Sequence, residues 1–307
     1  MRRQFAGEAF PVTSTMRAPE GRTFDTAAEA LDFYNMNWIA EEHPLMTGSG
    51  LEVTSHKALV RNDTGKVISV VGKDYTPIQN NDSFAAFDIL CKKYGAKWTR
   101  GVTMYGGRKT MLQAVIGHGE VRKGNIIENR ITGFNAFDGS SSWKLFDTPM
   151  RLVCLNGMRA ADNSSAIKVA IRHTKNAMYK YEEALRVFNV AQKQFMEFIE
   201  TSRALAQKMI DRDKAIKLIR EVFEIPAEQT TEEIPAGKRV KMNTVYSLFR
   251  EGKGNQGDSA YDFMNGVTEF VDHHSGKTGE DHEVYAMIGA GARMKQRAMN
   301  LAVGELK

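Results

Sequence analysis

The hydrophobic pattern of this 307-residue chain changes once, at about Lys175, and that change constrains the fold more than any other feature. Before it, short runs in which apolar and polar residues alternate are separated by turn residues, as in antiparallel strands. After it, apolar residues from Met178 to Met209 recur at helical spacing without Gly or Pro, which predicts one helix of up to about 35 residues over 175–210. The sequence therefore predicts an α+β fold in which a mainly antiparallel sheet precedes the helices.

The strands are expected to form hairpins within one sheet spanning about residues 52–173. Gly106-Gly107 suits a tight hairpin turn because glycine adopts positive φ without strain. A helix that begins at Asn81 or Asp82 and ends at Gly95 is expected between the second and third strands. The expected strands are 53–60, 66–72, 97–105, 109–117, 126–137, 142–154 and 167–173.

The flanking regions are expected to be helical. Asp25 is expected to cap a short helix that ends near Tyr34. The expected division is an N-terminal arm and helix (1–50), an α+β core that carries a basic segment (51–210) and a helical C-terminal region (211–307). Within the last part, the expected helices are 213–224, 240–251, 259–273 and 280–303.

Nearly all the excess positive charge lies in residues 97–175. This segment contains thirteen Lys and Arg against five Asp and Glu, while the rest of the chain nearly cancels to give the overall net charge of +5. Such a local positive field favours a polyanionic partner, because neutralising phosphates releases condensed counterions. The alternative is a solvated basic face on a protein with another role.

Aromatic residues are interleaved with these cations, as in proteins that bind single strands by stacking bases in a basic groove. In the strand 97–105, alternation places Trp98, Arg100, Val102 and Met104 on one face. The alternative is that the aromatic side chains pack in the core of the sheet. The candidate nucleic-acid-binding residues are Lys97, Trp98, Arg100, Tyr105, Arg108, Lys109, Arg122, Lys123, Arg130, Trp143, Lys144, Arg151, Arg159, Arg172 and Lys175.

Four of these cations give the most specific hypothesis. Arg151 and Arg159 flank the Asn156-Gly157 turn, while Arg172 and Lys175 lie where the last strand passes into the long helix. If the two elements are neighbours, the four cations converge at one end of the sheet, where guanidinium groups can bind phosphate bidentately. The alternative is that Arg151 or Arg172 pairs with a nearby acid, Asp147 or Asp162.

The sequence offers little for catalysis or metal binding. There is no phosphate-loop motif, and two cysteines form neither a disulfide framework nor a CxxC zinc site, which indicates a reducing compartment. No apolar run approaches the ~20 residues needed to cross a bilayer. We therefore expect no catalytic residue, metal ligand, cofactor or membrane contact. The densest metal-like cluster, which matches no metal signature, is Asp272, His273, His274, Asp281, His282 and Glu283.

Four stretches of the chain together carry a family resemblance. They are Val60–Gly65 continuing to Val70–Asn80, Met150–Gly157, Ile171–Thr174, and Asn265–His273 followed by Gly289–Lys295. Read together, they resemble a family found in phage and plasmid genomes and catalogued as domain of unknown function 932. The resemblance covers about residues 35–303, and Asn156-Gly157-Met158 departs from it where Asn-Thr-Leu is expected.

The resemblance implies a mobile-element protein of the bacterial cytoplasm, with a sheet-plus-helix core similar to that of phage single-strand annealing proteins. The expected function is non-catalytic binding or annealing of single-stranded DNA by a homo-oligomeric ring or filament. A phage exonuclease or a single-strand binding protein is the expected protein partner. Asp272-His273 and Arg293–Lys295 are expected to be structural. The alternatives are a metal-dependent nuclease using Asp138, Asp147, Asp162 and His173, and a protein that blocks a host defence factor.

Overall fold

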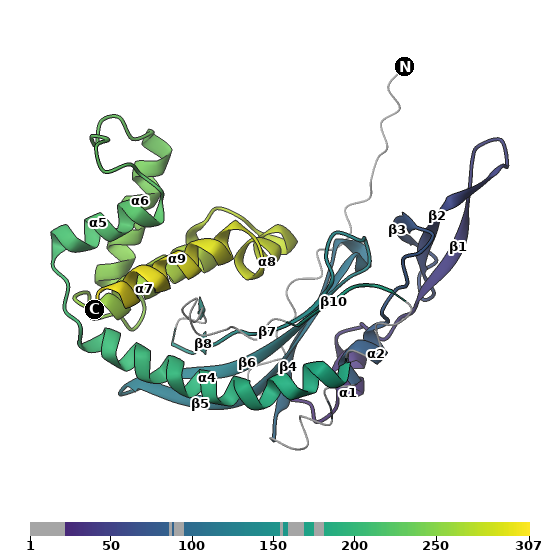
Figure 1. Ribbon diagram of the computed structural model, residues 1–307, viewed down its shortest axis with the longest axis horizontal. Coiled ribbons are helices and arrows are strands. Elements are labelled where there is room, and N and C mark those ends of the chain that lie inside the picture. The colour runs from purple at the N-terminus through teal and green to yellow at the C-terminus, as the bar shows by residue number, and fades with distance from the viewer. Residues whose placement is uncertain (1–21, 86–87, 89–94, 154–155, 159–168, 175–180) are drawn as a thin grey trace.

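The computed structural model describes residues 22–85, 88, 95–153, 156–158, 169–174 and 181–307. The fold is α+β: two antiparallel sheets are formed by strands between Ala40 and Ile171, and helices make up the C-terminal region, which confirms the predicted class. Figure 1 shows the three-stranded sheet at one end of an elongated molecule, while the strands of the seven-stranded sheet run along the molecule beside α4 (Tyr181–Gln207) and below the C-terminal helices.

The strands form two sheets rather than the single sheet predicted over 52–173. The first has the order β1-β2-β3, and the second runs β10-β7-β6-β5-β4, with β8 pairing β6 and β9 pairing β8. We did not predict β1, because its sequence Ala-Glu-Glu-His-Pro-Leu-Met has almost no apolar alternation and most of it is exposed. The bounds are β1 Ala40–Met46, β2 Glu52–Arg61, β3 Val67–Gly72, β4 Lys97–Met104, β5 Lys109–Arg122, β6 Asn125–Ala136, β7 Trp143–Asp147, β8 Met150–Arg151, β9 Asn156–Gly157 and β10 Val169–Ile171.

The predicted β4–β5 hairpin is present, but its loop runs from Tyr105 to Arg108, since Met104 pairs with Lys109. Gly106 and Gly107 take φ values of 68° and 111°, and Tyr105 also has positive φ, at 53°. Two glycines in succession therefore let the chain reverse with a strained backbone at one side-chain-bearing residue.

Trp98 and Arg100 were predicted to share one face of β4, and a bulge at Thr99 makes that prediction wrong. Trp98 pairs with Ala114, yet Arg100 pairs with Gln113, so two residues of β4 oppose one step of β5. Because neighbouring residues of β5 point to opposite faces, Trp98 lies on one face of the sheet and Arg100 on the other. Val102 and Met104 remain on the face of Arg100.

The face that carries Trp98 is covered by two short helices, α1 (Ala27–Phe33) and α2 (Asn80–Ala85). Thr26, not Asp25, caps α1: its side chain accepts from the Glu29 amide, and the Glu29 carboxylate in turn accepts from the amide of Thr26. The residues beyond α2, predicted as the rest of a helix to Gly95, lie largely outside the described residues. The buried side chains on this face include Leu31, Phe84, Trp98, Leu112, Trp143 and Leu145.

The opposite face packs against α8 (Gly279–Met287). Val102, Met104, Met111 and Phe134 form a core with Met287. Two polar contacts fix α8 to the same strand end: Arg100 donates to Glu283 at 2.6 Å, and the Tyr105 hydroxyl donates to Asp281 at 2.7 Å. Elements nearly 180 residues apart in sequence are therefore joined at β4.

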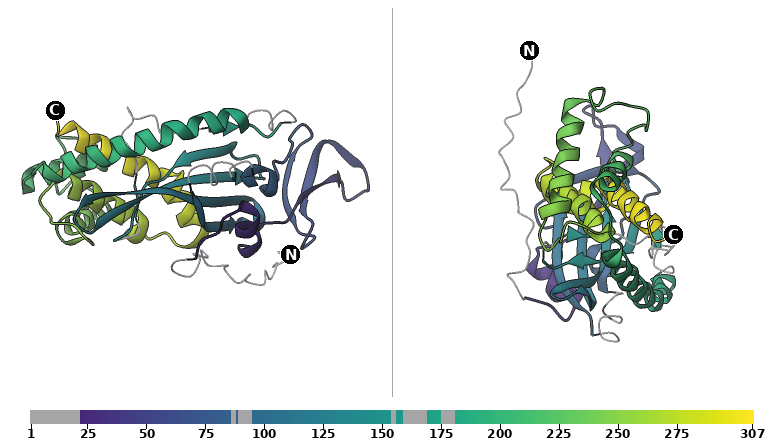
Figure 2. Two further views of the ribbon diagram at one scale, coloured as in Figure 1. Left: turned by 90° about the horizontal axis from the view of Figure 1, so that it is seen from below. Right: turned by 90° about the vertical axis from the view of Figure 1, so that its left-hand side faces the viewer.

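The C-terminal helices enclose α7 (Ala260–Glu269), whose ten residues are all buried. Around it lie α4 (Tyr181–Gln207), α5 (Arg212–Val222), α6 (Ala236–Glu251) and α9 (Ala290–Gly304). Figure 2 shows α4 as the long helix that runs beside the strands, and Gly119 of β5 allows its close approach, since an added Cβ there would lie 2.6 Å from Ile199. The long helix was predicted over 175–210, and its first six expected residues lie outside the described part.

The single helix predicted over 280–303 is instead two helices, α8 and α9, separated at Ile288 and Gly289. Gly289 lies so close to the backbone of Tyr285 that a Cβ would be 3.0 Å from the Tyr285 Cα. The apolar spacing continues across this break, so periodicity alone could not reveal it. In the described part of the chain, no helix combines the length and apolar character required to cross a bilayer.

Candidate nucleic-acid interface

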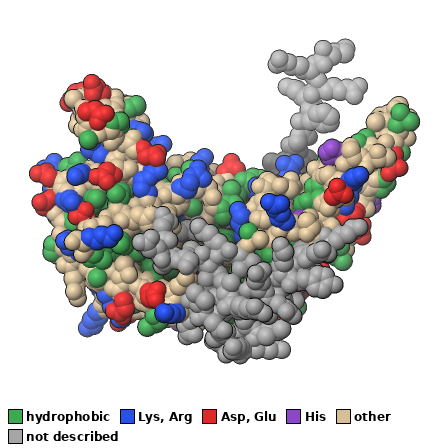
Figure 3. Space-filling view, viewed as in Figure 1, with side chains coloured by type: hydrophobic (Ala, Val, Ile, Leu, Met, Phe, Trp, Pro, Cys, Tyr) green, Lys and Arg blue, Asp and Glu red, His purple; other side chains and the backbone are tan. Residues whose placement is uncertain are grey.

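In the folded chain, Lys and Arg side chains outside the segment 97–175 also contribute to the positively charged surface. Figure 3 shows Lys and Arg side chains over the helical part as well as over the sheet part of the surface. The position and partners of each cation therefore decide which of them are available to an anionic ligand.

Two of the three candidate stacking aromatics lie in the core. Trp98 is 3% exposed and Trp143 is fully buried. The Trp98 indole donates to the Asp88 carboxylate at 3.0 Å. The alternative of core packing therefore describes both indoles, and neither offers a ring face to a base.

Tyr105 is half-buried, and both its hydroxyl and its ring have partners. The hydroxyl donates to Asp281, and the Lys109 ammonium lies 5.3 Å from the ring centroid. Burial, together with the hydrogen bond to Asp281, raises the pKa of Tyr105 to about 12. The side chain acts as a link between the β4–β5 loop and α8.

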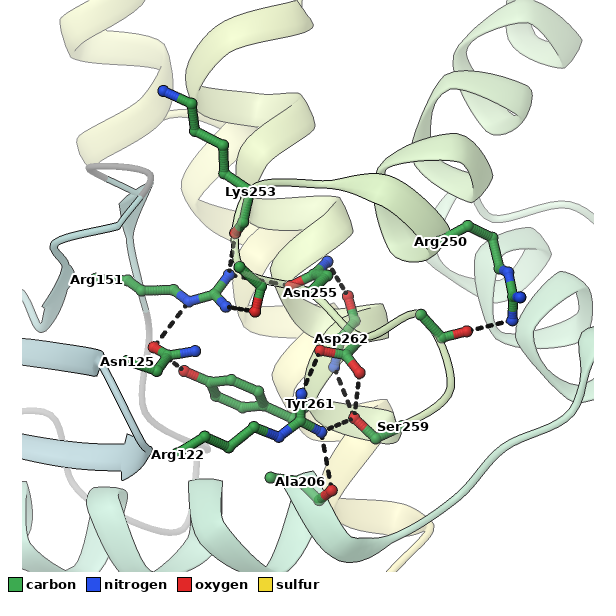
Figure 4. A network of polar contacts seen from close by, with 12 residues as sticks. Arg122, Asn125, Arg151, Ala206, Arg250, Lys253, Asn255, Ser259, Tyr261 and Asp262 are labelled. Carbon is green, nitrogen blue, oxygen red and sulfur yellow. Dashed lines mark hydrogen bonds and ion pairs between the residues drawn. The ribbon is translucent and has the colours of Figure 1, made fainter.

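Arg122 and Arg151 bind the helical region from the end of the sheet, on either side of Tyr261 (Figure 4). Their guanidinium carbons lie 5.5 and 5.4 Å from the Tyr261 ring centroid. Arg122 pairs with the fully buried Asp262 carboxylate at 2.8 Å and also donates to Ser259 and to the carbonyl of Ala206. This arginine thus connects β5 with α4 and α7.

Arg151 is completely buried. Its guanidinium donates to the Asn125 side chain at 3.0 Å, to the Asn255 side chain at 3.0 Å and to the carbonyls of Lys253 and Gly254 at 3.0 and 2.6 Å. These acceptors come from β6 and from the glycine-rich loop after α6. The guanidinium N–H groups of Arg151 that could bind a phosphate therefore already donate to acceptors within the protein.

The four cations expected to converge do not do so where the structure describes them. Arg151 pairs with Ile127 of β6, whereas Arg172 follows β10, which pairs with β7 opposite Phe134. Seven residues of β6 separate these positions, or about 23 Å at the rise of a strand. Arg159 and Lys175 lie outside the described residues.

Four other candidate cations have acidic partners. Arg100 pairs with Glu283, and Lys97 with Asp25 across the exposed start of β4. Arg130 pairs with Glu128 two residues earlier, and the Lys109 ammonium lies 3.7 Å from the Asp138 carboxylate. These contacts reduce the charge that each cation can offer to a ligand.

The remaining candidates are Arg108, Lys123, Lys144 and Arg172. Arg108 is exposed and donates to the carbonyl of Ile68 at 3.1 Å, and Lys123 is exposed in the β5–β6 turn. Lys144 pairs with Ala170 across the β7–β10 edge, so Arg172 lies diagonally beside it on the same face. None of the four has an ion pair within the described part of the chain.

A further group of cations, which the sequence interpretation missed, lines a cavity of about 330 Å³ in the helical region. Lys238 and Lys241 reach it from α6, and Arg293 reaches it from the first turn of α9. Among the described residues none of these three cations has a carboxylate within ion-pair distance. The cavity thus concentrates positive charge that the protein does not neutralise.

The start of α9 adds to the preference of this cavity for an anion, whereas the Glu224 carboxylate, which also lines it, acts in the other direction. The cavity is lined by Ala290, at the start of the fifteen-residue helix α9, and no side chain caps that start. Uncapped amides and the helix dipole attract negative charge at such an end. Arg297 contributes a fourth cation, which pairs with Glu224 at 2.6 Å, and the Tyr285 ring supplies an aromatic wall.

The cavity was missed because charge was counted along the chain. Lys238-Arg239-Val240-Lys241 is a basic run, but the residues before it include Glu228, Glu232 and Glu233, which cancel it in any local sum. Figure 3 shows acidic side chains gathered at the tip of the loop between α5 and α6, and Lys and Arg side chains interspersed with acidic ones below it. Folding therefore separates charges that neighbour one another in sequence.

The short stretches that carry the family resemblance meet at two places. At the first, the Gly157 amide donates to Asp272 at 2.9 Å and the Gly157 carbonyl accepts from Lys295 at 2.9 Å. At the second, the His173 ring stacks on Tyr75 at 4.8 Å, and the His173 carbonyl accepts from the Thr76 amide. The described parts of these stretches thus serve as structural junctions, as expected for Asp272 and Lys295.

Neither the cluster of Asp, Glu and His at 272–283 nor the acids considered for a nuclease form a metal centre within the described residues. No group of three or more His, Cys, Asp or Glu side chains there could hold a metal ion. Of the acids considered for a nuclease, Asp138 lies in the turn before β7 and Asp147 ends that strand, while Asp162 lies outside the described part.

Comparison with known proteins identifies a family but no characterised relative. No curated protein and no solved structure matches the chain. A family model matches residues 67–302, which include every described strand from β3 onward and the C-terminal helices up to the last two residues of α9. The chain belongs to the family described as Domain of unknown function (DUF932).

Proposed function

We propose that this protein binds single-stranded DNA through its phosphate backbone, without cleaving it, and promotes annealing of complementary strands. The observation that carries the proposal is the cavity lined by Lys238, Lys241 and Arg293, three cations without an acidic partner among the described residues. A phosphate placed there meets point charges from two lysines, the fork of an arginine and the amides at the start of α9.

A strand needs more than one such contact. Lys144 and Arg172 offer a second pair of cations on the sheet, without an ion pair among the described residues, and we propose that a strand of several nucleotides contacts both sites. Each phosphate neutralised releases condensed counterions, so the binding free energy becomes less favourable as salt rises. The buried indoles supply no stacking, and we propose that phosphate contacts provide most of the affinity.

The first experiment measures the affinity for a fluorescein-labelled oligothymidylate as a function of salt concentration. The decisive variant is Lys238→Gln/Lys241→Gln/Arg293→Gln, and its matched control is Lys193→Gln/Lys208→Gln/Lys217→Gln, which removes the same charge from exposed positions in α4, α5 and the segment between them. The cavity variant should bind at least tenfold more weakly and lose about two units of salt slope, at about 0.7 per phosphate. An equal loss in both variants would assign the binding to net charge alone.

Annealing and cleavage are tested separately. Acceleration of duplex formation between two complementary labelled strands, measured by energy transfer, supports annealing. We propose that annealing is performed by a ring or filament of identical chains, partnered with an exonuclease or a single-strand binding protein. Light scattering with and without DNA tests that assembly. Loss of intact oligonucleotide that requires added Mg²⁺ or Mn²⁺ would replace this proposal with a nuclease.

A further inference from the structure

A second cavity, of about 270 Å³, lies between α5 and α6. Its apolar lining comes from Ile216 and Ile219 of α5, Met242 of α6 and Ile234 of the loop that joins the two helices. Ile216 is 36% exposed although it is a large apolar residue on a helix surface. Tyr246 closes one side. The cavity therefore presents apolar surface to solvent.

Three arginines, Arg212, Arg220 and Arg239, also line this cavity, and no acidic residue does. Arg220 donates to the carbonyls of Pro226 and Gln229 and thereby holds the α5–α6 loop. Arg212 and Arg239 have no ion pair within the described residues. The acidic loop has its own internal contacts, since the Glu233 carboxylate accepts from the Thr230 amide at 2.7 Å.

The second cavity uses a different face of α6 from the first. Lys238 and Lys241 line the first, whereas Arg239, Met242 and Tyr246 line the second, and the helical repeat places these two sets about 100° apart. The two cavities also differ in kind. The first is surrounded by cations and the start of a helix, while the second has an aliphatic floor with cations around it.

We propose that the second cavity binds a short acidic peptide segment of a partner protein, with one or two apolar side chains inserted between α5 and α6. Charge complementarity selects this occupant: carboxylates flanking the inserted residue meet Arg212 and Arg239, whose guanidinium groups suit bidentate pairing. Burial of an apolar side chain against the aliphatic residues is favourable. These residues offer no extended aromatic surface on which bases could stack. The inference does not depend on the proposed function.

The test uses a fluorescein-labelled hexapeptide of four aspartates followed by Leu and Phe, titrated with the full chain and followed by fluorescence anisotropy. Two control peptides replace either the aspartates with lysines or the last two residues with alanines. We expect saturable binding of the first peptide, and at least tenfold weaker binding of each control.

Two protein variants assign the site. Arg212→Glu/Arg239→Glu should weaken peptide binding at least tenfold, while Lys208→Glu/Lys217→Glu, which reverses the same charge at neighbouring exposed positions, should leave it within about twofold. Ile216→Gln tests the apolar component and should also weaken binding. Affinity of all three variants for oligothymidylate is measured in parallel, and we expect it to stay within about threefold of the parent chain.

Three results would overturn the inference. The first is no saturable peptide binding up to about 1 mM, a free energy of only about −4 kcal/mol. The second is equal weakening by the two charge-reversal pairs. The third is loss of oligothymidylate binding in Arg212→Glu/Arg239→Glu alone, which would assign this face to nucleic acid. Failure of DNA binding in the parent chain would leave the peptide result standing and would refute only the proposed function.

Discussion

Asp272 and Lys295 form an ion pair whose side chains are only 10% and 2% exposed, and each binds one backbone group of Gly157. The pair joins the turn of Phe270–His274 to α9 and fixes the β9 corner between them. Its burial means that neither charge can turn to solvent if the other is removed.

Lys295→Met should therefore destabilise the fold strongly, by about 3–5 kcal/mol, because it leaves the Asp272 carboxylate buried without a counter-charge. The double variant Lys295→Met/Asp272→Leu removes both charges and should recover part of that loss. Urea unfolding followed by circular dichroism measures both. A Lys295→Met variant within 1 kcal/mol of the parent chain would show that the pair contributes little to stability.

Arg151 and Arg172 should respond oppositely to replacement by methionine. Arg151→Met deprives buried acceptors on Asn125, Asn255 and the 253–254 carbonyls of their donors, so about 3 kcal/mol of stability should be lost. Arg172→Met alters an exposed side chain and should change stability by less than about 0.5 kcal/mol.

The same two variants separate stability from binding. DNA affinity per folded molecule should fall in Arg172→Met and not in Arg151→Met, under conditions where both variants are folded. The opposite pattern would return Arg151 to the candidate interface and remove Arg172 from it.

His173 should make the protein sensitive to acid. Burial lowers the pKa of His173 to about 4 in the folded chain, although the charge of Asp138 acts in the other direction. The unfolded chain binds this proton near pH 6.5, so unfolding takes up a proton between the two values. The contribution of His173 is intact above pH 6.5 and is lost as the pH falls toward 4, to a total on the order of 3 kcal/mol.

His173→Phe keeps a ring against Tyr75 but cannot titrate. Its unfolding free energy should therefore decline less steeply than that of the parent chain between pH 6.5 and 4, as measured by urea titration at each pH. Parallel pH profiles for the two proteins would mean that His173 is protonated equally in the folded and unfolded states.

Arg100 and Glu283 should determine how firmly α8 is held against the sheet. Arg100→Met leaves the Glu283 carboxylate, which is 10% exposed, beside an apolar core without its partner. We expect amide hydrogen exchange in α8 to accelerate at least tenfold, while exchange in β6 changes little. Lys97→Met, at an exposed ion pair of the same strand, serves as the control and should leave α8 unaffected.

Local patterns predicted much of the secondary structure. Alternation located most of the strands from β2 onward, but the single strand predicted over 142–154 is divided into β7 and β8, and Asn156-Gly157, predicted as a turn, forms β9. The two glycines located the β4–β5 loop, and helical spacing located the long helix. The division into two sheets could not be predicted, because alternation gives a strand two faces but does not identify its neighbour. β1 was missed for a related reason: its exposed acidic residues carry no signal of burial.

The candidate site was less predictable than the fold, because the availability of a cation depends on a partner that is distant in sequence. Arg122 pairs with an aspartate 140 residues later, and Arg100 with a glutamate 183 residues later. Neither acid contributes to the local charge that made the segment 97–175 prominent. Conversely, Lys238 and Lys241 are masked in sequence by glutamates that lie elsewhere on the folded surface.

Because of the bulge at Thr99, β4 can lose one residue at this position without a change in the face to which its other side chains point. With Thr99 deleted, Trp98 and Arg100 become consecutive residues and would still point to opposite faces, so both packing surfaces would be preserved. Deleting Val102 instead would invert every side chain between the cut and the next loop. The facing of the other β4 side chains therefore does not require Thr99. Its carbonyl accepts a hydrogen bond from the Tyr34 hydroxyl at 2.9 Å.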